Sequence, residues 1–421
     1  MAHLGGAAAR AVTGDEPERG LMTGAPPFPP GTAVTLANWQ DPPFNRWAFQ
    51  HVRELIPSAQ IASGPGRRRP LPRAGQELGG IAFSHDGREL TVSQWLDTSW
   101  TDGICVLHNG RVVAERYFNG MRPETPHLLM SVSKSVTSTV AGIVAGRGVL
   151  DPAAEVAAIV PELGATSFAG ATVQDLLDMR AGTRFNEDYD DPDADVRTYE
   201  RVYLWRPTVA QATQADADDA IEYFGTLRNS GPHGGLFIYR SVLTDVLAWV
   251  IERAAGERLH ELIARELWQP MGAEFDAEIT VDRRGNPMAD GGICATLRDM
   301  ARFGQLFLRR GMAGRRRVVP AWWIEDTVRG AADGPQAFAD GDGATRYAEG
   351  GHYRNCWWVR DPAAPFFYAS GINGQHVFVH GPSDTVIAKL STWPVAWSEE
   401  LYGQSVAAAL AIARSLAGGR A

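Results

Sequence analysis

The order of β-rich and helical segments along the chain restricts the fold more than any other feature of the sequence. Residues 103–118 alternate between apolar and polar positions around Asn109-Gly110, the strongest short signal of a β-hairpin. Further β-rich runs, bounded by Gly, Pro and Asp, lie within residues 354–393. Helical patterns occupy residues 131–147, 172–179, 216–228, 241–254, 258–268 and 398–416.

Strands early and late in a chain, with helices between them, favour one sheet completed by the C-terminal part. The order predicts an α/β (α+β) fold, with an antiparallel sheet flanked by helices and an inserted, mainly helical domain. We assign residues 36–165 and 285–421 to the α/β domain and residues 166–284 to the helical domain. Residues 1–35 are rich in Ala, Gly and Pro without periodicity, which predicts a flexible N-terminal leader.

The composition argues against several classes of partner. The 421 residues are 44% hydrophobic and carry a formal net charge of −9, whereas nucleic acids and anionic membranes bind basic surfaces. We see no run of about 18 apolar residues and no apolar core near the N-terminus. We therefore expect a cytoplasmic protein without a membrane span, whose ligand is a small molecule.

Neither a metal nor a cofactor is expected. The cysteines Cys105, Cys294 and Cys356 are scattered without the spacing of a zinc site or a disulfide framework. Five aspartates within residues 188–195 superficially suggest calcium, but the glycine and the terminal glutamate of an EF-hand loop are missing. We interpret this segment as a solvated lid loop.

Lysine is rare in this chain. Lys134 and Lys389 are two of the 40 basic residues, and the other 38 are arginines. An arginine keeps its proton near neutral pH, whereas a desolvated lysine amine can lose it. Lys134 lies three residues after Ser131 in the first turn of a predicted helix, so hydroxyl and amine share one helix face. We expect burial and the helix dipole to lower the pKa of Lys134, so that the amine can take the proton of Ser131.

Other interpretations of these residues stay open at this point. A Ser-x-x-Lys pair alone is weak evidence, because it arises by chance in roughly one chain in ten. Lys389 lies in a β-rich run without such a serine, and we interpret it as a surface or strand-edge charge. Tyr239, in a Tyr-x-Ser motif just before a helix, is suited to carry a proton to a leaving group. A single tyrosine at such a position is more often a core residue.

Three motifs together resemble a known family. Ser131-Val-Ser-Lys134, Tyr239-Arg-Ser241 and the segment SGINGQ follow the order of the penicillin-recognising serine hydrolases, near class C β-lactamases and related esterases. Longer blocks are similar to the 6-aminohexanoate-dimer hydrolases, which degrade nylon oligomers. These blocks cover nearly the whole chain after residue 35 and are NWQDPPFNRWAFQHVRELIPSA, HLLMSVSKS, NEDYDDP, TDVLAW, ADGGICATLRDMARFG and VIAKLSTWP.

The resemblance implies a β-lactamase-like fold, a homodimer and an acyl-enzyme mechanism. It implies that Ser131 is the acylated nucleophile, Lys134 its base and Tyr239 the proton shuttle to the leaving group. It also implies an oxyanion hole formed by the backbone N–H groups of Ser131 and Ile372.

Further residues are implied to bind the substrate. Tyr189 corresponds to a loop tyrosine that closes over the substrate and hydrogen-bonds its amide nitrogen; an exposed loop aromatic is the alternative. Trp358 and Asn373 are implied to line the pocket, although a tryptophan in a strand packs in a core equally often.

The chain departs from the efficient amide-cleaving members at three positions. Glu200 stands where they carry an aspartate that pairs with the substrate ammonium, Asp290 replaces an asparagine, and Tyr402 replaces a histidine. Glu200 keeps the charge and can still hold an ω-ammonium, with a helix-surface glutamate as the alternative. Asp290 adds negative charge near the cleft, which assists an ammonium or repels a substrate carboxylate.

These observations predict a serine hydrolase that cleaves linear amides of 6-aminohexanoate and short-chain carboxylic esters. A carboxylesterase without useful amidase activity is one alternative. A β-lactamase or D-alanyl-D-alanine carboxypeptidase is another, although GINGQ stands where those enzymes use a Lys-Thr-Gly strand. A non-catalytic ligand sensor is the third, and the joint presence of Ser131, Lys134 and Tyr239 argues against it.

Overall fold

The computed structural model describes residues 20–65, 70–207, 217–343 and 350–418, and its elements follow the predicted order. Its strands are β1 (Ser58–Ile61), β2 (Ala82–His85), β3 (Arg88–Thr91), β4 (Thr101–His108), β5 (Arg111–Tyr117), β6 (His127–Leu128), β7 (Ala277–Thr280), β8 (Ile293–Ala295), β9 (Met312–Ala313), β10 (Arg316–Arg317), β11 (His352–Arg354), β12 (Trp357–Asp361), β13 (Phe366–Gly371), β14 (Gln375–His380) and β15 (Thr385–Ser391).

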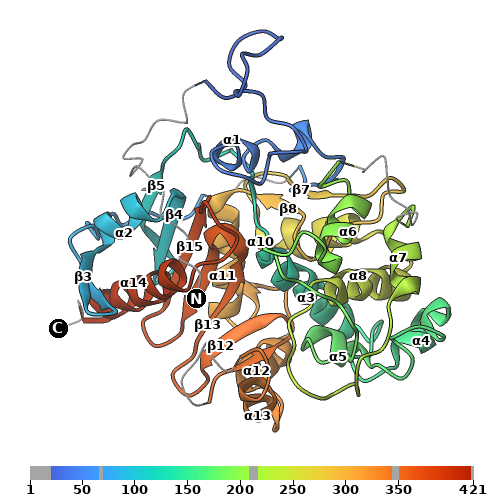
Figure 1. The fold of residues 1–421 in the computed structure, drawn as a ribbon. Helices are drawn as coiled ribbons and strands as arrows, with labels where there is room; N and C mark the ends of the chain where they lie inside the picture. Colours follow the sequence, from blue (N-terminus) through green and yellow to red (C-terminus); the bar gives the residue numbers. More distant parts are fainter. Residues whose placement is uncertain (1–19, 66–69, 208–216, 344–349, 419–421) are drawn as a thin grey trace.

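The helices are α1 (Asn45–Ala48), α2 (Val92–Thr98), α3 (Val132–Ala145), α4 (Val156–Ile159), α5 (Val173–Leu177), α6 (Asp195–Val202), α7 (Ala220–Thr226), α8 (Val242–Ala255), α9 (Leu259–Leu262), α10 (Gln269–Met271), α11 (Leu297–Leu308), α12 (Ala321–Arg329), α13 (Gly334–Ala339) and α14 (Glu399–Gly418). Short 3₁₀ turns are η1 (Val52–Glu54), η2 (Pro161–Leu163) and η4 (Ile372–Gly374), and η3 (Ile263–Trp268) is π-helical. Figure 1 shows α4 to α8 gathered on one side of the molecule and the large sheet with α2 and α14 on the other.

A seven-stranded antiparallel sheet confirms the predicted fold class. Its strand order is β11-β12-β13-β14-β15-β4-β5, so the early hairpin β4–β5 adds directly to the late strands. The hairpin turn is formed by Asn109 and Gly110, whose φ values of 51° and 75° are those of the turn that this residue pair favours. The C-terminal part of the chain therefore completes a sheet begun some 250 residues earlier, as the order of segments predicts.

Helices cover both faces of this sheet. A Cβ added at Gly304 of α11 would lie 2.6 Å from Val386 and 2.8 Å from Val377, so α11 lies directly against their face. Neighbouring residues of a strand point to opposite faces. His376 therefore points away from α11, and its ring lies near Tyr402 of α14.

Lys389 contradicts its interpretation as a surface or strand-edge charge. It lies in β15, an interior strand, and its side chain is fully buried. The amine lies 5.2 Å from the ring centre of Trp95 in α2 and donates a hydrogen bond to Ser391. The interpretation is wrong because both faces of β15 are covered, and a short β-rich run does not reveal how many layers cover it.

A second sheet was not predicted. It is antiparallel, with the order β1-β7-β8-β6, and its strands have two to four residues each. Strands this short carry too little alternation to be recognised in a sequence. Strand β7 lies within residues 166–284, the predicted helical domain, but pairs with β1 and β8 of the predicted α/β domain. The sheet therefore links the two predicted domains, and the domain boundaries stay a prediction.

The predicted helices form with bounds that differ from the prediction by a few residues. The helix at residues 131–147 is α3, and that at residues 172–179 is α5, which begins with a capping box at Thr172. The segment 258–268 is part α-helical and part π-helical. Residue 216 of the helix predicted at 216–228, and residues 1–19 of the predicted leader, lie outside the described residues. Val34, near the end of that leader, is buried.

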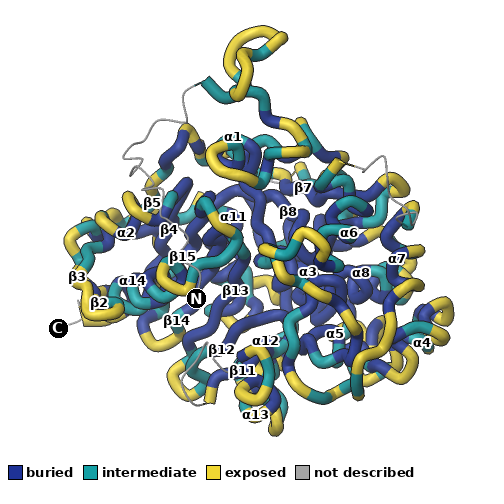
Figure 2. Tube along the Cα trace, in the orientation of Figure 1, coloured by how far each residue is buried: buried dark blue, intermediate teal, exposed yellow. Residues whose placement is uncertain are grey.

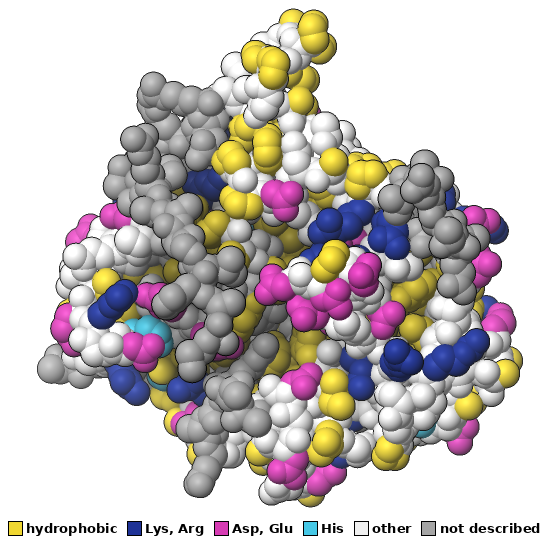
Figure 3. All heavy atoms as spheres, viewed as in Figure 1, with side chains coloured by type: hydrophobic (Ala, Val, Ile, Leu, Met, Phe, Trp, Pro, Cys, Tyr) yellow, Lys and Arg dark blue, Asp and Glu magenta, His cyan; other side chains and the backbone are white. Residues whose placement is uncertain are grey.

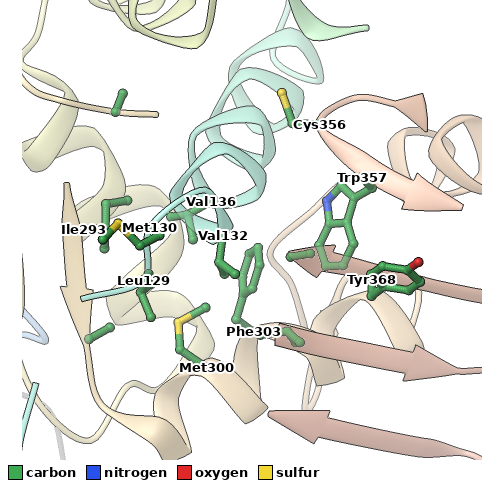
Figure 4. Packing of buried hydrophobic residues seen from close by; sticks show 14 of the residues in the cluster. Leu129, Met130, Val132, Val136, Ile293, Met300, Phe303, Cys356, Trp357 and Tyr368 are labelled. Atoms are coloured by element: carbon green, nitrogen blue, oxygen red, sulfur yellow. The ribbon is translucent and has the colours of Figure 1, made fainter. Parts of the chain in front are cut away.

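The core fills the space between the sheet and the helical side. Figure 2 shows the buried residues concentrated around α3, α8 and the central strands. In Figure 4, Val132 at the start of α3 lies beside Phe303 of α11, and the rings of Phe303 and Trp357 of β12 stack 5.7 Å apart. The first turn of α3 is thus anchored in the core. Among the described helices, none is both long and apolar enough to cross a membrane.

Candidate active site

Ser131 lies at a sharp turn between β6 and α3. Met130, which precedes it, has a φ of 48°, a left-handed conformation that non-glycine residues rarely adopt. Ser131 is the N-cap of α3, but its side chain makes no cap hydrogen bond. Instead, its Oγ accepts a hydrogen bond of 2.9 Å from Lys134 Nζ. The hydroxyl is therefore held by the amine, as the spacing of the two residues predicts.

Lys134 is buried and donates three hydrogen bonds. The acceptors are Ser131 Oγ at 2.9 Å, Ser241 Oγ at 2.9 Å and the backbone carbonyl of Asp290 at 3.0 Å. The Asp290 carboxylate lies 3.6 Å away. Burial alone lowers the pKa of Lys134, but the charges of Tyr239, Asp290 and Glu187 outweigh it, so the net shift is upward. The predicted lowering of this pKa is wrong, because the sequence does not reveal the anionic groups that surround the amine.

Two residues to which the sequence assigned no role complete this hydrogen-bonded group. Ser241 Oγ donates to Glu187 Oε1, and its backbone N–H donates to Glu187 Oε2 at 2.6 Å. Burial raises the pKa of Glu187, while Lys134 lowers it. Ser241 could have been found as the third residue of the Tyr-x-Ser motif. Glu187 lies in the block NEDYDDP, but nothing in the sequence distinguishes it from the acids beside it.

Tyr239 lies over the Lys134 amine. Its ring centre is 5.1 Å from Nζ, and the ring stacks on Trp358 at 5.6 Å with an interplanar angle of 19°. Burial raises the pKa of Tyr239 above its ordinary value, although the charge of Lys134 and the neighbouring Ser131 lower it. The three residues predicted from the motifs are therefore brought together, and Trp358 lies beside them.

The end of β13 lies against the backbone of Ser131. A Cβ added at Gly371 would be 2.9 Å from the Ser131 nitrogen and 2.7 Å from the Leu129 carbonyl oxygen. This close approach brings Ile372 to the same cavity as Ser131. Ser131 and Ile372 thus line one cavity, which the predicted oxyanion hole requires.

A cavity of about 570 Å³ opens above Ser131. One part of its lining is acidic and another is aromatic or aliphatic, and no Lys or Arg belongs to the described lining residues. The acidic residues are Glu187, Asp188, Asp190 and Asp342, and the apolar ones are Phe185, Tyr189, Ile238, Tyr239, Trp358, Ile372, Val395, Ala396 and Trp397. Figure 3 shows acidic side chains gathered near the middle of the face in view. A larger cavity of about 940 Å³, beside Arg302 and Met312, contains none of the candidate catalytic residues.

Tyr189 reaches this cavity from the predicted lid loop. Its hydroxyl donates to Glu187 Oε1 at 2.9 Å, and its ring lies 5.5 Å from the guanidinium of Arg197. Aspartates of the loop accept backbone N–H groups within it, as Asp188 does from Asp190 at 2.9 Å. These local hydrogen bonds shape the loop that carries Tyr189.

The cavity lining does not include three residues that were predicted to bind the substrate, Glu200, Asn373 and Asp290. Glu200 is buried and paired with Arg197 at 2.8 Å and with Arg206, which also contradicts a helix-surface position. Asn373 donates from Nδ2 to the carbonyls of Trp393 and Val395, and so holds the segment that forms the cavity rim.

Asp290 lies beside Lys134, with its Oδ2 at 3.6 Å from Nζ, and does not line the cavity. Tyr402 shares a hydrogen bond with the hydroxyl of Tyr368 beneath α14, and it does not line the cavity either.

Comparisons with known proteins agree with this arrangement. A sequence model of the family described as Beta-lactamase matches residues 94–411. The chain is 37% identical over 408 residues to a 6-aminohexanoate-dimer hydrolase of Paenarthrobacter ureafaciens, covering 96% of this chain and 98% of the relative.

Solved structures are similar as well. One from Bacillus anthracis, described as a candidate 6-aminohexanoate-dimer hydrolase, has a TM-score of 0.83 and 28% identity, covering 92% of this chain and 98% of that one. A class C beta-lactamase from Rhodobacter sphaeroides has a TM-score of 0.54 and 16% identity, covering 76% and 96% respectively, and shares the fold.

Proposed function

The chain belongs to the beta-lactamase family of serine hydrolases, and we propose that it cleaves linear amides of 6-aminohexanoate and short-chain carboxylic esters. The observation that carries this proposal is the contact of Ser131 Oγ with Lys134 Nζ at 2.9 Å, on the floor of a cavity that Tyr239 and Ile372 also line. The relative from Paenarthrobacter ureafaciens bears the name of the amide-cleaving activity.

In this proposal, Ser131 Oγ attacks the acyl carbonyl and its proton passes to Lys134. Tyr239 then protonates the leaving nitrogen or oxygen, and water hydrolyses the acyl-enzyme to regenerate Ser131. The backbone N–H groups of Ser131 and Ile372 stabilise the oxyanion.

Lys134 must first lose a proton, because its surroundings favour the ammonium form. A chain of hydrogen bonds from Nζ through Ser241 Oγ to Glu187 offers a route. Glu187 lines the cavity, and burial raises its pKa, which suits a proton acceptor.

The cavity lining supports an aliphatic substrate with a positive charge. Aromatic and aliphatic side chains accommodate a methylene chain by burying it, and carboxylates favour an ammonium. Asp342 is exposed at the cavity and accepts the backbone N–H of Tyr239 at 2.8 Å, which leaves its other oxygen for a substrate. Because Glu200 is already paired with two arginines, we propose Asp342 in place of Glu200 as the partner of the ammonium.

The test is Ser131→Ala, assayed with p-nitrophenyl butyrate and with the linear dimer of 6-aminohexanoate. We expect turnover of both to fall by about four orders of magnitude or more. Ser415→Ala, on the exposed side of α14, is the matched control and should keep wild-type activity. Unchanged turnover in Ser131→Ala would contradict the mechanism.

Other outcomes distinguish the alternatives. Turnover of the ester without the dimer would indicate a carboxylesterase, and hydrolysis of nitrocefin would indicate a β-lactamase. Failure of a fluorophosphonate probe to label Ser131 would favour a ligand sensor. A cytoplasmic location and a homodimer complete the proposal, and light scattering after size-exclusion chromatography measures the oligomeric state.

A further inference from the structure

Asp290 is a second carboxylate near the catalytic amine, besides Glu187. Its backbone carbonyl accepts a hydrogen bond from Lys134 Nζ at 3.0 Å, and its Oδ2 lies 3.6 Å from the same atom. Its Oδ1 is buried, and within the described part of the chain it has no hydrogen-bond partner. A buried carboxylate oxygen without a donor is unfavourable by itself, and the Lys134 amine is the cationic group beside this carboxylate.

Asp245 of α8 fixes the position of Asp290. Its Oδ1 accepts the backbone N–H groups of Ala289 at 2.5 Å and of Asp290 at 3.1 Å, and its Oδ2 accepts the hydroxyl of Tyr199 at 2.5 Å. Asp245 therefore has three donors of its own, and its side chain also interacts with the side chain of Asp290. Burial raises the pKa of Asp245, and the charge of Asp290 raises it further, so the two acids influence each other.

The charges around Lys134 come from several elements. The titratable groups that face the amine are Asp290 before β8, Asp245 in α8, Tyr239 before α8, Glu187 in the loop before α6 and Cys356 before β12. Asp290 differs from Glu187 in its position. Glu187 lines the cavity and is linked to Lys134 through Ser241, whereas Asp290 does not line the cavity and reaches the amine without an intervening side chain.

We propose that the Asp290 carboxylate is a positioning residue that holds Lys134 in its ammonium form and so sets the pH above which Ser131 is activated. This inference rests on the proposed serine hydrolase function. An asparagine at this position would keep the backbone carbonyl and the shape but not the charge. Enzymes with a neutral residue here would then reach full activity at lower pH.

The test is Asp290→Asn, with kcat/KM for p-nitrophenyl butyrate measured against pH. Loss of a charge beside an ammonium shifts its titration by about one unit, so the acidic limb should move about one unit toward lower pH. Asp290→Glu keeps the charge and should keep the acidic limb near its wild-type position. Asp384→Asn, which removes an equal charge at the far end of β14 and β15, is the control that should not shift it. An unshifted limb in Asp290→Asn would overturn the inference.

The two lysines allow a direct measurement that does not depend on activity. Labelling with [ε-¹³C]lysine gives two side-chain signals, which the Lys389→Met variant assigns. The Lys134 signal of the wild type should titrate above the ordinary lysine value of about 10.4, and Asp290→Asn should lower this midpoint. If Asp290→Asn does not fold, a wild-type midpoint below about 10.4 overturns the inference. Failure of the proposed function would be seen in a different experiment, because turnover would then survive in Ser131→Ala.

Discussion

Gly371 and Ser131 lie so close together that a single methyl group at position 371 would be 2.9 Å from the Ser131 backbone nitrogen. The obstacle on both sides is backbone, since the Leu129 carbonyl oxygen would be 2.7 Å away. Backbone cannot rotate aside as a flexible side chain can. The distance between β13 and the turn at Ser131 therefore depends on the absence of a side chain at position 371.

Gly371→Ala should separate Ile372 from Ser131 and lower kcat for p-nitrophenyl butyrate by about 100-fold, the usual effect of losing an oxyanion donor. Gly225→Ala is the matched control, because a Cβ at this position in α7 meets no atom within 4 Å. It should keep full activity. Equal activity of the two variants would mean that Ile372 does not contribute to the oxyanion hole.

Tyr189→Phe should affect amides more than esters. The Tyr189 hydroxyl reaches Glu187 at 2.9 Å at the edge of the cavity, where it is available to the leaving nitrogen of an amide. We expect turnover of the linear dimer to fall by about tenfold, the lower range for losing a polar contact in the transition state, with turnover of p-nitrophenyl butyrate unchanged. A proportional loss of both activities would assign Tyr189 to loop structure alone.

Asp342→Asn should weaken the binding of the substrate, whereas Glu200→Gln should lower the stability of the fold. An asparagine at 342 can still accept the Tyr239 N–H, so we expect a KM increase of about three- to tenfold for the cationic dimer and no change for a neutral ester. Glu200→Gln breaks a buried pair with Arg197 and Arg206 and should lower the free energy of unfolding by about 1 to 3 kcal/mol. Kinetics and urea denaturation of both variants measure these effects. A selective KM increase in Glu200→Gln would restore Glu200 as the ammonium partner.

Lys389 should make stability depend on pH. Burial lowers the pKa of Lys389 to about 7 from 10.5 in the unfolded chain, so between these values the unfolded state binds more protons. Stability should therefore rise with pH across this window, by about 2 kcal/mol between pH 7 and pH 9. Lys389→Met removes this contribution, and the difference in unfolding free energy between wild type and variant isolates it. A difference independent of pH would show that the buried amine does not titrate in this range.

The sequence by itself determined the features that depend on neighbouring residues. The hairpin at Asn109-Gly110 follows from the backbone conformations that this pair favours, and Ser131 and Lys134 meet because residues three apart share a helix face. The order of strands and helices was enough to predict the sheet, and the motifs together indicated the family. Each of these conclusions rests on local geometry or on a pattern that the linear chain displays.

The tertiary structure alone decided the electrostatics. Asp290 is 156 residues from Lys134 and Ser241 is 107 residues away, and no local pattern places them at one amine. Lys389 was misinterpreted for the same reason, since its burial depends on distant segments. Charges interact strongly where water is excluded. Which charged groups are buried together depends on how the sheet and the helices pack.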